Sequence, residues 1–73
     1  MFSVAVKSAM NELWGSKGRK VQIDGVVRTI TSVRVVYGIN IQFRLDQPLP
    51  GCTSELFDVE PQNAVEVRNA LVN

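Results

Sequence analysis

The side chains that most enzymes use for acid–base and nucleophilic chemistry are either missing from this sequence or scattered along it. The 73 residues contain no histidine, the side chain whose unperturbed pKa lies nearest neutrality. Its absence excludes Ser-His-Asp and Cys-His nucleophile arrangements and zinc sites with imidazole ligands. The seven acidic residues do not cluster, and we interpret Asp58 and Glu60 as solubilising charges at a sheet edge. We therefore predict no catalytic residues, no metal site and no cofactor.

Two other features, a glycine-containing segment and a cysteine, could in principle bind phosphate or act as a nucleophile, but both have structural interpretations. The segment from Gly15 to Gly18 lacks the spacing of a phosphate-binding loop and precedes a strand where that loop requires a helix, so we interpret it as a helix-to-strand linker. Cys52 is the single cysteine, and no adjacent cation activates its thiol, so we interpret it as a small loop residue. One cysteine cannot form an internal disulfide, which favours a reducing, cytoplasmic setting.

Charge is distributed unevenly along the chain. Residues 1–44 contain seven of the eight basic residues and two of the seven acidic residues, a formal charge of +5, whereas residues 45–73 carry −4. If the two parts segregate in space, the molecule is dipolar. Arginine and tyrosine are enriched in the residues that dominate binding interfaces. The predicted binding residues are Arg34, Tyr37, Gln42 and Arg44 on the polar face of a sheet, with Arg19 and Lys20 at its entrance. The alternative is that this face is only the soluble outside of the sheet.

The elements that position these residues begin with a predicted helix over residues 4–14. Its apolar positions recur at helical spacing, at Phe2, Val6, Ala9, Met10 and Leu13. We expect Ser3 to cap the N-terminus of this helix and Gly15 to end it in a left-handed conformation. The segment carries Lys7 and Glu12 and is too short to span a bilayer, so no membrane partner is expected.

From residue 20 onward the apolar period falls to two, which predicts antiparallel strands. Asp24-Gly25 is a strong hairpin signal, because both central residues of a type I′ turn need positive φ. The apolar parity changes within residues 26–37, and a bulge or bend near Thr31-Ser32 would reconcile the two halves. Arg28 shares the parity of the apolar positions before the bend. Either the hairpin turn is longer than two residues and Val27 faces inward, or Arg28 sits at an open edge.

The clearest strand follows a second turn at Tyr37-Gly38. Its inward residues are expected to be Ile39, Ile41, Phe43 and Leu45, and Phe57 and Val59 are expected to face inward on the last strand. Pro61 suits the first position of a helix, with Ala64, Val67 and Leu71 at helical spacing. The expected strands cover residues 20–23, 26–30, 33–37, 39–46 and 55–59, and the C-terminal helix covers residues 61–71.

These elements define an α+β class: an N-terminal helix, a curled antiparallel sheet of four to five strands, and a short C-terminal helix in one domain of residues 1–73. The hairpins at Asp24-Gly25 and Tyr37-Gly38, the bend and the run from Phe57 to Pro61 make residues 18–61 resemble a small SH3-like β-barrel. Domains of that architecture are mostly adaptors in translation, transcription and signalling assemblies. The resemblance therefore implies a binding role.

Trp14 lies off the apolar stripe of the predicted helix. We expect it to wrap onto the sheet, because the core has few large side chains. If it is exposed instead, Trp14 with Met10 makes an apolar anchor for a partner protein or a second subunit.

These observations predict a non-catalytic protein-binding module acting as a monomer or homodimer. Its small size and lack of a catalytic constellation fit a regulator or inhibitor, of viral or mobile-element type, that binds a larger host complex such as the transcription machinery. The alternative is a nucleic-acid-binding SH3-like barrel that uses the basic N-terminal half. The sequence pI of about 7.9 is below the strongly basic values typical of that class.

Overall fold

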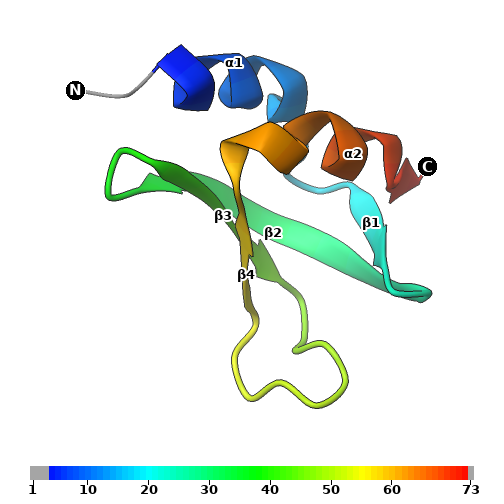
Figure 1. Ribbon diagram of the computed structural model, residues 1–73. Helices are drawn as coiled ribbons and strands as arrows, with labels where there is room; N and C mark the ends of the chain where they lie inside the picture. Colours follow the sequence, from blue (N-terminus) through cyan, green and yellow to red (C-terminus); the bar gives the residue numbers. More distant parts are fainter. Residues whose placement is uncertain (1–3, 73) are drawn as a thin grey trace.

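The computed structural model describes residues 4–72, which form two helices and five strands. Both helices lie on the same side of the sheet, while the loop of residues 46–55 projects from the opposite end of the molecule (Figure 1). In chain order the elements are α1 (Val4–Leu13), β1 (Lys20–Ile23), β2 (Val26–Val36), β3 (Asn40–Leu45), β4 (Leu56–Val59), the 3-10 turn η1 (Pro61–Asn63), α2 (Ala64–Asn69) and β5 (Leu71–Val72). The predicted α+β class is confirmed.

The five strands form one antiparallel sheet in the order β4-β3-β2-β1-β5. The sheet curls but does not close, since β4 and β5 are its two edges and do not pair with each other. Of the two architectures predicted, the structure has the curled open sheet. A bulge at Thr31 shifts the pairing of β2 with β3 between Ile30 and Ser32. This is the bend that the change of parity predicted, and it joins the two expected strands into one.

Helix α1 forms because its apolar positions make a stripe that packs against the sheet and α2. Val6, Ala9 and Leu13 are buried, at the spacing expected for one face of a helix. Gly15 then adopts a φ of +85°, the left-handed conformation in which glycine ends helices without a steric penalty. The predicted cap at Ser3 lies outside the described residues.

The core lies between the helices and the inner face of the sheet. Phe43, Ile41 and Leu45 on β3 are buried as predicted. They cluster with Ile30 of β2, Val21 of β1 and Val59 of β4. Ala9 and Leu13 of α1 and Ala64 of α2 complete the cluster. Phe57 is only partly buried and packs against the edge of this core.

Two expectations about the core were wrong. Ile39 is 59% exposed, because it belongs to the turn that separates Val36 from Asn40 and not to the strand. Leu71 does not continue the C-terminal helix. Helix α2 ends at Asn69, and Leu71 pairs with Val21 as part of β5.

Arg28 follows the second of its two predicted alternatives. The turn has two residues, since Ile23 pairs with Val26, and β3 pairs with β2 only from Ile30 onward. At this open stretch of β2, the Arg28 guanidinium donates from Nε and Nη2 to the carbonyl of Pro48, at 3.2 and 3.1 Å. These hydrogen bonds connect the strand to the projecting loop.

Candidate functional site

The outer face of β2, β3 and β4 carries a row of hydrogen-bonded polar side chains. The register places Gln42 opposite both Arg34 and Asp58. The Arg34 guanidinium donates to Gln42 Oε1 from Nε at 2.9 Å and from Nη2 at 2.6 Å. Gln42 Nε2 in turn donates to Asp58 Oδ1 at 3.0 Å. The amide of Gln42 therefore connects a guanidinium to a carboxylate across three strands.

Arg44 lies two residues from Gln42 on the same face and forms an ion pair with Glu55. Both side chains are close to half exposed, at 49% and 41%, so solvent screens the pair and it adds little stability. The ion pair has a larger effect on the electrostatic potential of this face. Arg34 and Arg44 each have a carboxylate from the acidic half of the chain nearby, so the two halves do not segregate on this face.

Tyr37 stands at the tip of the β2–β3 hairpin and is 90% exposed. Its φ is +56° and that of Gly38 is +70°. A tyrosine in the left-handed region is uncommon, because its Cβ crowds the following carbonyl. The structure thus confirms the turn and presents the aromatic ring to solvent.

Arg19 and Lys20 lie on a different part of the sheet. Lys20 pairs with Thr29, and the carbonyl of Arg19 accepts a hydrogen bond from the amide of Ile30 at 2.8 Å. Ile30 is four residues from Arg34 along β2, roughly 13 Å at the rise of a strand. The structure therefore brings Arg34, Gln42 and Arg44 together and leaves Arg19 and Lys20 apart from them.

Trp14 is 83% exposed, so the expectation that it packs on the sheet was wrong. Helix α1 ends at Leu13, which is buried, and the chain turns away at Gly15 before the indole can reach the core. Ser16 fixes this turn: its buried hydroxyl donates to the Leu13 carbonyl at 2.6 Å, and its amide donates to the same oxygen at 3.1 Å.

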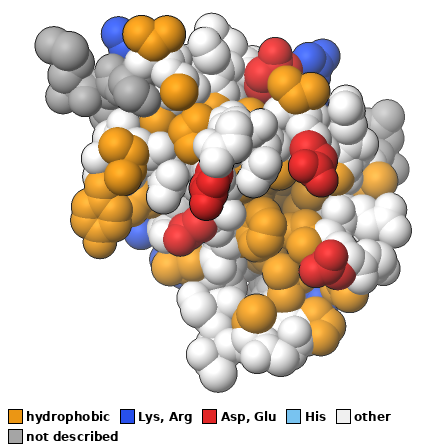
Figure 2. Space-filling view, viewed as in Figure 1, with side chains coloured by type: hydrophobic (Ala, Val, Ile, Leu, Met, Phe, Trp, Pro, Cys, Tyr) orange, Lys and Arg blue, Asp and Glu red, His pale blue; other side chains and the backbone are white. Residues whose placement is uncertain are grey.

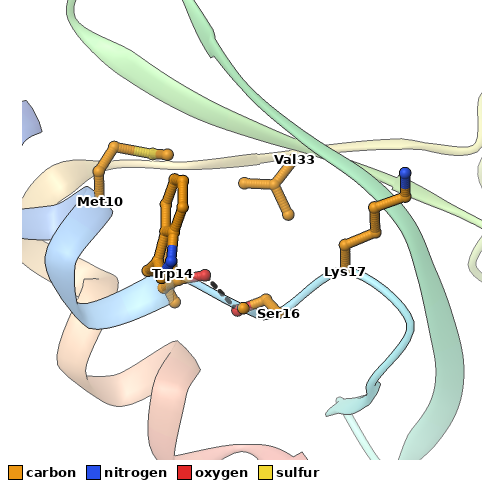
Figure 3. A pocket seen from close by; sticks show the side chains of 7 residues that line it. Met10, Trp14, Ser16, Lys17 and Val33 are labelled. Carbon is orange, nitrogen blue, oxygen red and sulfur yellow. Dashed lines mark hydrogen bonds between the residues drawn. The ribbon is translucent and has the colours of Figure 1, made fainter.

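The indole borders a shallow hollow of about 350 Å³, which we call the Trp14 hollow. Figure 3 shows Met10 and Val33 on the two sides of the Trp14 ring, with the side chain of Lys17 beyond Val33. Leu13, Gly15 and Ser16 complete the lining. The sequence signal for this site was the position of Trp14 off the buried stripe.

Within residues 4–72, no three cysteine or acidic side chains lie close enough together to hold a metal ion. Cys52 lies in the loop, as predicted, and it is exposed. The carboxylate of Asp58 accepts a hydrogen bond from Gln42. No helix in the described part of the chain is long and apolar enough to cross a membrane.

Comparison with known proteins gives no relative: no family model, no curated protein and no solved structure matches this chain.

Proposed function

We propose that this protein is a non-catalytic protein-binding module whose main apolar contact is the Trp14 hollow. The observation that carries the proposal is the 83% exposure of Trp14 next to a depression lined by Met10, Leu13 and Val33. Large aromatic side chains held in the open are costly for solubility, and they are the anchors most often found at the centre of interfaces.

The energetic argument favours tryptophan over the other exposed residues. Covering an indole removes roughly 200 Å² from water, worth on the order of 4 to 5 kcal/mol before the cost of association. Because association itself costs at least about 4 kcal/mol, the neighbours must contribute. Met10 and Val33 supply further apolar area beside the ring.

The charge around the hollow indicates what the partner surface carries. Lys17 lines the hollow, and Lys7 is exposed on α1 three residues before Met10, a spacing that makes the two neighbours on the helix surface. A partner that accepts the indole in an apolar pocket and offers a carboxylate beside it would complement both features.

The outer face of the sheet is a second proposed contact, through Arg34, Gln42, Arg44 and the exposed ring of Tyr37. Arg34 is hydrogen-bonded to Gln42, and Arg44 forms an ion pair with Glu55. The nearby carboxylates also lower the positive potential that phosphate binding needs. This supports a protein partner over a nucleic acid. A regulatory role on a larger complex, and a cytoplasmic location, stay predictions.

The test uses the fact that Trp14 is the single tryptophan of the chain. Proteins captured from a lysate of the source cells with the wild-type chain are identified, purified and titrated into it while tryptophan emission is recorded. We expect emission to shift to shorter wavelength as the indole leaves water, and we expect Trp14→Ala to lose the captured partner. Val65→Ala, which shortens an exposed apolar side chain on α2 outside the hollow and outside the outer face of the sheet, is the control and should retain the partner.

A partner that binds Trp14→Ala as well as wild type, or that leaves the emission wavelength unchanged, would refute the anchor. Affinity that falls steeply with salt, together with equal binding of oligonucleotides, would favour the nucleic-acid alternative instead.

A further inference from the structure

A second apolar depression lies between strands β1 and β4, which do not pair with each other. Two adjoining hollows share Ile23 and Asp24 and run from α2, between β1 and β4, to the loop at Leu49. We call this the β1–β4 groove. Its larger apolar lining residues are Val21, Ile23, Val26, Leu49, Phe57 and Val67. It shares no lining residue with the Trp14 hollow.

The charged side chains that line the groove are acidic, while Arg28 is hydrogen-bonded to the Pro48 carbonyl next to the Leu49 end of the groove. Among the described residues that line it, the charged ones are Asp24 and Glu66, both acidic. Figure 2 shows the apolar surface in this region flanked by acidic side chains, with the visible basic side chains towards the periphery of the view. A cationic ligand is therefore attracted to the groove and an anionic one is repelled.

The backbone of β4 points hydrogen-bonding groups towards the same gap. Leu45 donates to the carbonyl of Glu55 at 2.8 Å, and the register continues through the pairs of Phe43 with Phe57 and Ile41 with Val59. Alternate residues of an antiparallel edge strand direct their N–H and C=O groups to opposite sides. Since Glu55 and Phe57 face β3, Asp58 directs its backbone groups away from β3, to the open edge of the sheet.

We propose that the β1–β4 groove binds an extended segment of a partner protein in which apolar residues alternate with lysine or arginine. The segment pairs with the free edge of β4 as an added strand. Its apolar side chains pack on Phe57 and Ile23 in the groove. Its basic side chains alternate to the outer face beside Asp58, and the carboxylates of Asp24 and Glu66 add to the attraction of a cationic segment. The groove combines apolar side chains, acidic side chains and the unpaired edge of β4. This combination fits an extended segment better than a helix, because a helix would leave the backbone groups of the strand edge without partners.

The experiment titrates the ¹⁵N-labelled protein with a synthetic six-residue peptide in which Lys and Val alternate. We expect chemical shift changes at Ile23, Phe57, Asp58 and Glu66, and none at the Trp14 indole. A Glu–Val peptide of equal length should not bind. Two further peptides carry N-methyl groups on the backbone nitrogens, one at every Lys and the other at every Val. Only alternate residues of an added strand donate hydrogen bonds to β4, so one of these two peptides should fail to bind and the other should bind normally.

The protein variant Asp24→Asn/Glu66→Gln should weaken binding of the Lys–Val peptide by about three- to tenfold, the range expected for two exposed ion pairs. Asparagine suits the left-handed backbone of position 24, where φ is +51°. Glu12→Gln/Glu55→Gln removes the same charge outside the groove and should leave the affinity unchanged.

Absence of binding even at millimolar peptide, equal binding of the Glu–Val peptide, or binding that survives both N-methylations would each overturn the proposal. Shift changes confined to the Trp14 hollow would do the same. Because Trp14→Ala leaves the groove intact, it should bind the Lys–Val peptide as wild type does. The groove and the Trp14 anchor are therefore tested separately.

Discussion

Replacing Trp14 with alanine should cost little stability, whereas the same change at the adjacent Leu13 should cost much. Trp14 is 83% exposed and Leu13 is 1% exposed. The covered part of the indole, about one sixth of roughly 250 Å², corresponds to about 1 kcal/mol or less. Leu13→Ala removes a buried side chain and leaves a cavity, which costs about 3 kcal/mol. For a domain of this size, with a total stability of about 4 to 11 kcal/mol, the second loss is severe.

The two variants are compared by urea unfolding followed by far-ultraviolet circular dichroism, because Trp14→Ala has no tryptophan fluorescence to follow. We expect the midpoint of Trp14→Ala to stay near that of wild type and the midpoint of Leu13→Ala to fall, with equal slopes for both transitions. Equal destabilisation by the two changes would mean that the indole is packed in solution. The Trp14 hollow would then lose its role as a contact surface.

Three further changes test other local features. Ser16→Ala removes the hydroxyl that donates to the Leu13 carbonyl and should lower the free energy of unfolding by about 1 kcal/mol; an unchanged urea midpoint would mean that the Ser16 amide suffices. Arg44→Glu places a second carboxylate beside Glu55 and should cost about 0.5 kcal/mol, which Arg44→Glu/Glu55→Arg should recover in a double-mutant cycle, whereas additive losses would contradict the ion pair. Tyr37→Asn should stabilise the hairpin by about 0.5 kcal/mol, because asparagine tolerates positive φ better; a lower melting temperature would show that the tyrosine ring makes stabilising contacts.

The regular parts of the fold follow from periodicity and turn chemistry. The buried stripe of α1 and the alternation at Ile41, Phe43 and Leu45 could be predicted because a single face of each element meets the core. The turn at Asp24 could be predicted because few residue pairs accept two successive positive φ values, here +51° and +80°. A change of parity indicated the bulge at Thr31, since one extra residue reverses the faces that follow it.

The incorrect predictions concern short elements and the ends of elements, where tertiary packing outweighs the local pattern of apolar residues. Ile39 continues the parity of β3 but lies in the turn, and parity alone cannot show where a strand begins. Leu71 keeps helical spacing with Val67, yet it pairs with Val21 once α2 has ended. For Trp14, the expectation of burial came from its size, whereas its position off the stripe indicated exposure. Neither the β1–β4 groove nor the partners of Arg34 and Arg44 could be predicted, because they depend on how strands distant in sequence come together.

The free edge of β4 also affects how the protein behaves when it is concentrated. Two copies that joined edge to edge through Leu56–Val59 would bring their Asp58 carboxylates near each other, and the short strand is followed by Glu60 and Pro61. Like charges at a bare edge, and a proline after it, are the means by which natural sheets avoid aggregation. The edge of β4 therefore disfavours pairing with a second copy of itself, while it remains available to a cationic strand.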